Sequence, residues 1–241
     1  VLGKRADAGA LPALFAIAKS GETPIRVAAI RAIAESGQPR AAAGLVQMLG
    51  GADNDIAQAA QESLASLPGP ETDAIVLAML NASDASRRIT GLDLIARRRM
   101  TGSLDVVVNA ASDADVKVRS TAIKRLGELA GPSDQPKILT MLLKAKPGSE
   151  LDAAEQSLAS LSVRMDNPDA AAAKLIPAMS QANAEKQGAL LRVLSIVGGK
   201  TALASVRSAV KSSDPEVRNS AISALGDWKT ADAGPDLLAL A

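Results

Sequence analysis

Acidic residues that recur at nearly equal spacing are the first group in this sequence that could do chemistry. Two carboxylates held close together can serve as general acid and general base. Each of these positions, however, comes directly before a predicted helix, where a side-chain oxygen accepts hydrogen bonds from free backbone N–H groups. The positions hold Glu22, Asp53, Asp84, Asp115, Pro147, Asn183 and Asp214, so five are carboxylates and Asn183 is another good cap. Helix capping accounts for this spacing, and we do not expect paired-carboxylate catalysis.

Other common catalytic side chains are missing, because the sequence contains no histidine and no cysteine. The usual serine and cysteine nucleophile arrangements, and zinc sites built from nitrogen and sulfur, are therefore excluded. We expect no catalytic, cofactor-binding or metal-binding residue and no cofactor, and we predict that the chain is not an enzyme.

The segment Gly198–Thr201, reading GGKT, resembles the end of a phosphate-binding loop. That loop needs a glycine five residues before its last glycine, and Leu194 stands there instead. It also needs a preceding strand, whereas Leu190–Val197 is predicted to be helical. We interpret the two glycines as the end of one helix followed by the start of the next.

Basic residues concentrate in one part of the chain, which comprises Arg87, Arg88, Arg97, Arg98, Arg99, Lys117, Arg119, Lys124 and Arg125. Such a patch can bind an acidic partner or a phosphate group. Alternatively, cations near a helix C-terminus offset the helix dipole and stay solvated. Our candidate partner-binding residues are Arg97, Arg98, Lys124 and Arg125.

The elements that carry these residues repeat along the chain. Asp115–Gly127, reading DVKVRSTAIKRLG, predicts a helix with a capped start and one apolar stripe, and Asp214–Gly226 repeats the pattern. Seven copies place an apolar residue at the position of Leu126, namely Ile33, Leu64, Ile95, Leu126, Leu158, Leu194 and Leu225. The spacings are 31, 31, 31, 32, 36 and 31 residues. A fixed period of this size is typical of a solenoid.

A second, shorter helical pattern lies between these copies. Pro12, Pro136 and Pro235 fall at its expected first turn, where a helix tolerates proline best. Each repeat is therefore predicted to consist of a first helix, a tight turn, a second helix and another tight turn. The apolar content is 47%, but one Phe, one Trp and no Tyr contribute to it. The core is thus expected to consist of Ala, Leu, Ile and Val.

Charge gives no indication of a nucleic-acid or membrane partner. The net charge is +1, and no apolar segment approaches the roughly 20 residues that span a bilayer. At the position of Lys124, successive second helices carry Arg31, Glu62, Asp93, Lys124, Gln156, Arg192 and Ser223. One turn later they carry Glu35, Ser66, Arg97, Glu128, Ser160, Ile196 and Asp227. The signs are mixed, so we predict no continuous basic track, no nucleic acid and no membrane as partner.

Two of the copies carry a family resemblance. Val118–Ile123 reads VRSTAI and Val217–Ile222 reads VRNSAI, and these segments resemble HEAT repeats of the short bacterial kind, similar to phycobilisome-lyase repeats. The resemblance implies that second helices line a concave side. It also implies that the arginine after the valine meets an acidic cap, often from the adjacent repeat. That arginine occurs as Arg26, Arg88, Arg119 and Arg218, whereas Leu151 and Gln187 replace it in the fifth and sixth copies.

The predicted fold is all-α, a right-handed α-α superhelix (a HEAT-like solenoid) of about seven short helix-turn-helix repeats, forming one array over residues 1–241. An irregular stretch is expected near residues 162–183, because the repeat spacing swells there and Pro177 removes a helix hydrogen bond. Val1–Gly3 matches Ala224–Gly226, and Leu237–Ala241 lies in a first helix without a second. We therefore expect a fragment of a longer chain, with end-to-end self-contact through uncapped termini.

The function that these patterns favour is a non-catalytic scaffold or protein-binding module that uses the concave face. Its partner is expected to be a protein. The alternative is an accessory helical segment of a larger bacterial multidomain enzyme whose catalytic domain lies outside this chain. The gene sequence beyond both ends would distinguish these two functions. Composition does not indicate a cellular compartment.

Overall fold

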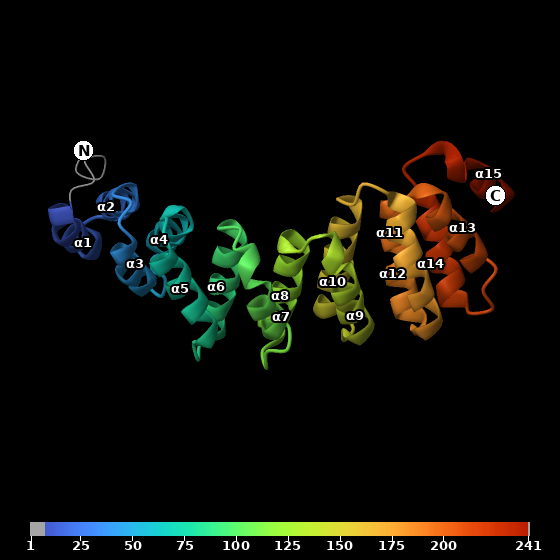
Figure 1. The fold of residues 1–241 in the computed structure, drawn as a ribbon, viewed down its shortest axis with the longest axis horizontal. Coiled ribbons are helices and arrows are strands. Elements are labelled where there is room, and N and C mark those ends of the chain that lie inside the picture. The colour runs from blue at the N-terminus through green and yellow to red at the C-terminus, as the bar shows by residue number, and fades with distance from the viewer. Residues whose placement is uncertain (1–7, 241) are drawn as a thin grey trace. The chain divides into compact units, whose positions relative to one another are not determined.

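The computed structural model describes residues 8–240, and the regular structure in this range is entirely helical. The chain divides into two compact units, Val1–Ser103 and Leu104–Ala241. Within each unit, helices follow one another in chain order as helix-turn-helix pairs (Figure 1). Odd-numbered α-helices are the first helices of the predicted repeats, and even-numbered α-helices are the second helices. The all-α class predicted from the sequence is confirmed.

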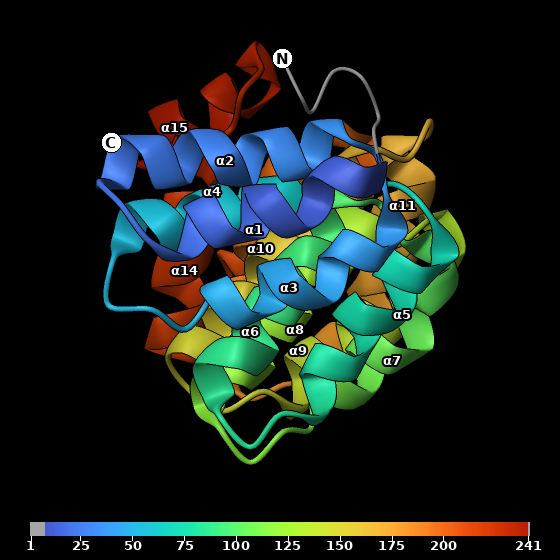
Figure 2. The same ribbon diagram turned by 90° about the vertical axis from the view of Figure 1, so that its left-hand side faces the viewer.

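The first unit contains three helix pairs, and α1 lies nearest the viewer in Figure 2 together with α2 and α3. Short 3-10 turns precede or extend several of its first helices, because a proline or a tight turn compresses the backbone there. Its α-helices are α1 (Leu11–Lys19), α2 (Thr23–Glu35), α3 (Ala42–Met48), α4 (Asn54–Ser66), α5 (Pro70–Ala78) and α6 (Ala85–Arg97). The 3-10 helices are η2 (Ala8–Ala10), η3 (Pro39–Ala41), η4 (Met79–Asn81) and η5 (Thr101–Ser103).

The second unit continues the same alternation through nine α-helices of its described residues, 104–240. They are α7 (Leu104–Ala110), α8 (Val116–Leu129), α9 (Gln135–Lys144), α10 (Ser149–Val163), α11 (Pro168–Leu175), α12 (Ala184–Val197), α13 (Gly199–Ala209), α14 (Pro215–Gly226) and α15 (Gly234–Leu240). The 3-10 helices are η6 (Pro132–Asp134), η7 (Ile176–Gln181) and η8 (Ala231–Ala233). Pro12, Pro136 and Pro235 each lie in the first turn of a first helix, as predicted.

The predicted core position is confirmed in all seven copies. Ile33, Leu64, Ile95, Leu126, Leu158, Leu194 and Leu225 are each at most 3% exposed. Consecutive second helices pack against one another within each unit, as α2 does on α4 and α8 on α10. In the second unit, aliphatic side chains from Ile123 to Ala233 form one continuous core cluster. Burial of one stripe between neighbouring helices therefore provides the apolar contacts that a globular core provides elsewhere.

Small residues allow adjacent second helices to approach closely. A side-chain carbon added to Gly127 would lie 2.6 Å from the Cα atom of Ser157. The Ser157 hydroxyl donates to the Ile123 carbonyl oxygen at 2.8 Å, and the Ser63 hydroxyl donates to that of Ile30 at 3.3 Å. Since backbone atoms are this close, a larger residue at Gly127 would force α8 and α10 apart.

Helix caps agree with the sequence at five of the seven positions. The side chains of Asp53, Asp84, Asp115, Asn183 and Asp214 accept hydrogen bonds from backbone N–H groups of the helix that each precedes. Glu22 occupies the N-cap of α2, but its side chain accepts no capping hydrogen bond. No side-chain cap is predicted at Pro147, and the N-cap of α10 is the next residue, Gly148, with φ of 90°. Proline has no side-chain oxygen to cap a helix, and glycine adopts this φ without strain.

Pro177 does not lie inside an α-helix, which corrects the sequence-based expectation. Helix α11 begins after its cap Asn167 and ends at Leu175, and Pro177 falls in the first turn of η7. Proline lacks the N–H that an α-helix needs and clashes with the preceding turn, so the chain tightens into a 3-10 helix. An irregular step in the stacking near residues 162–183, and a single array over residues 1–241, stay predictions.

The last described helix, α15, is attached to its unit mainly by polar contacts. Its Leu238 side chain is 82% exposed, and Asp236 pairs with Arg207 of α13 at 2.8 Å. At the other end of the chain, Val1–Gly3, which the sequence matches to a second helix, lies outside the described residues. End-to-end self-contact therefore stays a prediction.

Replacing Leu126 by alanine is expected to lower the free energy of unfolding by about 2–5 kcal/mol, because the side chain is enclosed. The same replacement at exposed Leu238 is the control and should change it by less than about 0.5 kcal/mol. Chemical denaturation followed by circular dichroism measures both values. A Leu126→Ala change as small as that of the control would contradict the repeat register.

Candidate functional site

The arginine in the fourth position after the cap binds the turn before its own helix. Arg119 Nη1 donates to the carbonyl oxygens of Asp113 and Ala114 at 2.8 and 2.9 Å. Arg88 Nη1 makes the same two contacts with its own turn, and Arg218 makes one of them. The free carbonyl groups of the turn attract a cation, so this residue stabilises the tight connection between a first and a second helix.

The sixth copy retains this contact without an arginine. Gln187 Nε2 donates to the Ala182 carbonyl oxygen at 2.9 Å, directly before the cap Asn183. The amide donor of Gln187 thus reaches the carbonyl group that an arginine reaches in other copies, but it forms no ion pair with an acid. In the fifth copy, Leu151 is buried and makes no such contact.

Two of these arginines also bind an acid of the next repeat. Arg26 Nη1 lies 3.8 Å from Asp53 Oδ2, as the family resemblance implies. Arg119 binds Glu150 instead of a cap, with its Nε and Nη2 atoms 2.9 and 2.5 Å from Oε1. These hydrogen bonds from Arg119 lower the pKa of Glu150, and the hydroxyl of Thr23 is the main cause of a lowered pKa at Asp53. Consecutive repeats are thus joined by ion pairs at the start of their second helices.

The contact between the second repeat (α3 and α4) and the third repeat (α5 and α6) differs from the two ion-paired contacts described above. Ala57 stands in the fourth position after Asp53, where the other repeats carry an arginine or a substitute. Arg87 stands in the third position after Asp84, where Ile56 and Val118 are buried in their own repeats. The cation therefore comes from the third repeat instead of the second, and it forms no ion pair within the described residues. This exchange was not predicted, although it is visible in the sequence when the copies are aligned by their caps.

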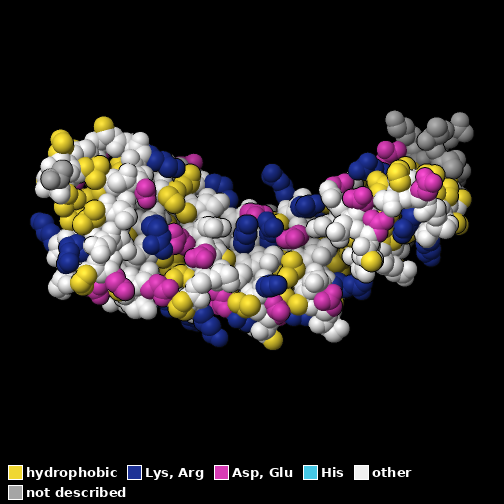
Figure 3. All heavy atoms as spheres, turned by 180° about the vertical axis from the view of Figure 1, so that it is seen from behind, with side chains coloured by type: hydrophobic (Ala, Val, Ile, Leu, Met, Phe, Trp, Pro, Cys, Tyr) yellow, Lys and Arg dark blue, Asp and Glu magenta, His cyan; other side chains and the backbone are white. Residues whose placement is uncertain are grey.

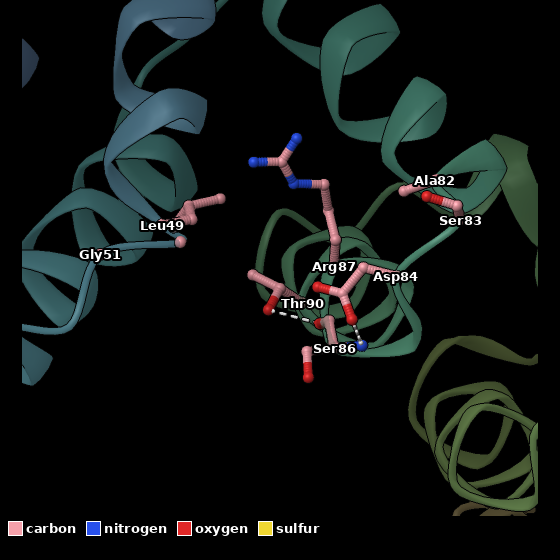
Figure 4. Close-up of a pocket in the computed structure, with 9 residues that line it drawn as sticks. Leu49, Gly51, Ala82, Ser83, Asp84, Ser86, Arg87 and Thr90 are labelled. Atoms are coloured by element: carbon pink, nitrogen blue, oxygen red, sulfur yellow. Dashed lines mark hydrogen bonds between the residues drawn. The ribbon is translucent and has the colours of Figure 1, made fainter.

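Arg87 projects into an open cavity of about 610 Å³ in the first unit. Figure 4 shows its side chain extending from α6 into the space between Leu49 and the turn at Ala82 and Ser83. The cavity is lined by Leu49, Gly50, Gly51, Ala82, Ser83, Asp84, Ser86, Arg87 and Thr90. No hydrogen bond or ion pair of the guanidinium is found within residues 8–240. Arg87 is therefore available to a ligand or partner.

The other polar groups of this cavity are mostly engaged with α6. Asp84 Oδ1 accepts from the Ser86 backbone N–H at 3.1 Å, and the Thr90 hydroxyl donates to the Ser86 carbonyl oxygen at 3.0 Å (Figure 4). The cavity thus contains one free cation and one carboxylate that caps a helix. Its net charge is close to zero before a ligand enters.

The three consecutive arginines of the predicted basic patch, Arg97 to Arg99, differ in exposure, contacts and backbone conformation. Arg97 is exposed on α6 and has no partner within the part of the chain that the structure describes. The Arg98 side chain is only 8% exposed. Its Nη1 atom donates to the carbonyl oxygen of Leu64 at 2.6 Å and to the carbonyl oxygen of Leu67. Its Nη2 atom lies 2.6 Å from Asp73 Oδ1. Arg99 has φ of 52° and ends α6 in the left-handed conformation.

Arg98 consequently does not serve as a partner-binding residue, which corrects the sequence-based selection. It satisfies the free carbonyl groups at the C-terminal end of α4, one repeat earlier. Arg164 does the same for α8, with Nη2 donating to the carbonyl oxygens of Gly127 and Ala130 at 2.8 and 3.0 Å. Neither contact follows from the spacing of residues along one helix.

The other two selected residues, Lys124 and Arg125, belong to the second unit, whereas Arg97 belongs to the first. Lys124 is exposed on α8, and Arg125 pairs with Glu128 one turn later. Other charges on the second helices pair between repeats, as Arg31 does with Glu62 at 3.8 Å. On the face shown in Figure 3, basic and acidic side chains are interspersed over both units. The absence of a continuous basic track along the second helices stays a prediction, and Arg97 and Lys124 stay candidates.

The segment that resembles a phosphate-binding loop joins two helices, as interpreted from the sequence. Gly198 ends α12 and α13 begins directly after it. The backbone N–H of Thr201 donates to Asp169 Oδ1 at 2.7 Å, and this contact lowers the pKa of Asp169. An internal carboxylate thus occupies the place where a nucleotide-binding loop would hold phosphate. Within residues 8–240, no cluster of three acidic side chains could hold a metal ion, and no helix is long and apolar enough to cross a membrane.

Replacing Arg98 by methionine removes the charge and keeps an unbranched side chain. We expect a loss of about 1–3 kcal/mol in the free energy of unfolding, because buried carbonyl groups and Asp73 lose their donor. Arg97→Met, one residue earlier and exposed, should change stability by less than about 0.5 kcal/mol. Equal effects of the two replacements in denaturant titrations would show that Arg98 does not stabilise α4.

Acidification should weaken the joint formed by Glu150. The pKa of Glu150 is lowered in the folded chain. The stability that its pairing with Arg119 contributes is therefore fully present above the ordinary pKa of 4.5, and it is lost as the pH falls through the lower pKa of the folded chain. The excess stability of the natural chain over Glu150→Gln should therefore shrink between neutral and acidic pH. Denaturation midpoints measured over this range test it, and a difference that does not vary with pH would contradict it.

Solved structures with a similar helical arrangement have low sequence identity to this chain. An engineered protein is 18% identical, with a TM-score of 0.44 and coverage of 93% of this chain and 69% of that one. Human deoxyhypusine hydroxylase is 16% identical, with a TM-score of 0.43 and coverage of 96% and 89%. The complex of CpcE and CpcF of phycocyanin lyase from Nostoc sp. is 18% identical, with a TM-score of 0.36 and coverage of 91% and 86%. No curated protein matches the sequence at a significant level.

The family comparison covers nearly the whole chain. HEAT repeats match residues 1–65, 72–159 and 172–241. The unmatched residues, 66–71 and 160–171, contain the ends of α4 and α10 and the starts of α5 and α11, and the other described α-helices lie entirely within the matched ranges. The chain belongs to the HEAT-repeat family.

Proposed function

We propose that this chain is a non-catalytic protein-binding module in which a carboxylate of the partner protein binds Arg87. One observation carries the proposal: the Arg87 guanidinium lies in a cavity of about 610 Å³ and has no acidic partner in the described chain. Two other joints hold internal ion pairs, Arg26 with Asp53 and Arg119 with Glu150. A partner's acid would complete the missing pair.

The chemistry of the cavity favours a single carboxylate over a phosphate group. A guanidinium presents two parallel N–H donors that match the two oxygens of a carboxylate. Asp84 also lines the cavity, so a doubly charged phosphate would meet repulsion that a singly charged side chain meets only in part. Ser83 and Ser86 also line the cavity and add hydroxyl groups to it. The proposed ligand is therefore an aspartate, a glutamate or a C-terminal carboxylate of a protein.

The exposed face of the second helices is the other surface that the sequence predicts for partner binding. Arg97 is its candidate in the first unit, and Lys124 is its candidate in the second. Much of the remaining charge on this face pairs internally, as with Arg192 and Glu155 at 2.7 Å. The cavity of Arg87 therefore offers a more specific contact. If the chain is instead an accessory segment of a larger enzyme, the carboxylate would come from another domain of the same polypeptide.

Affinity capture with the purified chain, followed by mass spectrometry, would identify the binding protein. Its dissociation constant would then be measured for the natural chain, Arg87→Met and Arg97→Met. Loss of a charge-assisted hydrogen bond costs about 1.5–3 kcal/mol, so Arg87→Met should weaken binding roughly 10- to 150-fold. Arg97→Met, on the same helix, should leave the affinity within about threefold.

Three results would contradict the proposal. The first is that the natural chain captures no protein from its own cells. The second is that Arg87→Met binds as tightly as the natural chain. The third is a loss confined to Arg97→Met, which would place the site on the exposed face of α6 instead. Thermal denaturation of both variants checks that each stays folded.

A further inference from the structure

The two first helices α7 and α9 leave an apolar groove between them in the second unit. A cavity of about 370 Å³ lies there, with Val108 and Ala111 on one side and Met141 on the other. Ile123 of α8 forms part of its floor. A smaller cavity shares Val108 and Met141 and continues the groove along the two helices. This volume accommodates large apolar side chains of a ligand.

The groove exists because α7 and α9 are not packed closely together. The first helices α11 and α13 of the same unit contact each other directly, whereas α7 and α9 make few direct contacts. Helix α7 has only 7 residues, and Val108 of this helix and Ala111, directly after its end, are too small to fill the gap. Apolar surface is thus left open between the first helices of two neighbouring repeats.

One rim of the groove is basic. Lys137 and Lys144 lie on α9 on either side of Met141, and both line the cavity. Since they are seven residues apart, they share one face of the helix, roughly 10.5 Å apart along its axis. Lys144 has no partner in the described part of the chain. Lys137 lies 3.1 Å from Asp134, but its side chain remains 54% exposed.

The one carboxylate that lines the larger cavity is already neutralised. Glu150 Oε1 accepts hydrogen bonds from Nε and Nη2 of Arg119 at 2.9 and 2.5 Å. Because Glu150 is already paired with Arg119, the groove presents an apolar floor beside the ammonium groups of Lys137 and Lys144. Its complement is an apolar residue flanked by acids.

We propose that this groove is a docking site for an acidic amphipathic helix of a partner protein. Two turns of that helix match the two lysines, so its acids are seven residues apart, with leucine or a similar side chain midway between them. The apolar side chains fill the cavity above Ile123 and beside Met141, and the acids pair with Lys137 and Lys144. This surface belongs to a different unit from the Arg87 cavity, so the two proposals can fail independently.

A fluorescein-labelled helical peptide with the core Glu-Ala-Ala-Leu-Leu-Ala-Ala-Glu is a suitable probe, titrated with the full chain in fluorescence anisotropy. Lys144→Glu should weaken binding about tenfold or more, because it places like charges together at the rim. Lys211→Glu makes the same charge change at an exposed position after α13 that does not line the groove, and should alter the affinity less than about twofold. A peptide with alanine in place of both leucines should bind at least about tenfold more weakly.

Absence of saturable binding up to about 1 mM peptide would overturn the proposal, since that limit corresponds to about 4.1 kcal/mol. So would equal losses for Lys144→Glu and Lys211→Glu, which would indicate unspecific charge attraction. Undiminished binding of the alanine peptide would show that the apolar groove is not used. Sedimentation that reveals a dimer lost in Lys144→Glu would identify a second copy as the occupant in place of a partner helix.

Discussion

Close contact between consecutive second helices is the constraint on which the rest of this structure depends. The chain has almost no aromatic side chains, so apolar burial must come from many small aliphatic contacts. Leucine or isoleucine fills the same position in every copy, and Gly127 and Ser157 allow the backbones of α8 and α10 to approach. Because each repeat buries its stripe only against neighbours, stability is distributed along the stack rather than held in one centre.

Short helices impose a second constraint, because each one leaves four N–H and four C=O groups without an internal partner. The described α-helices have 7 to 15 residues, so these ends form a large part of the backbone. Charged side chains satisfy them: Asp115 caps α8, Arg119 binds the preceding turn, and Arg98 reaches the end of α4. Many of the acids and arginines that look functional in the sequence thus hold repeats together.

Charges that remain after this internal pairing are the more informative ones. Arg87 in the first unit and Lys144 in the second each border a cavity, and neither has a partner in the described residues. Both suit acidic groups, which agrees with a module that binds proteins through a few specific contacts. The mixed charges of the second helices in the sequence predict no continuous basic track of the kind that nucleic acids would need.

Periodicity by itself determined the helical class, the order of first and second helices, the buried position of Leu126 and most of the caps, because each depends on residues within about one repeat. At Pro147 the repeat position lacks a capping atom, and the N-cap of α10 is Gly148 instead. Only the tertiary structure decided what Arg87 and Arg98 do. A long side chain can stay in solvent or reach a carbonyl group some 30 residues away in sequence, and position along one helix does not distinguish these outcomes. The cavities likewise depend on how closely neighbouring helices approach, which is set by packing across repeats.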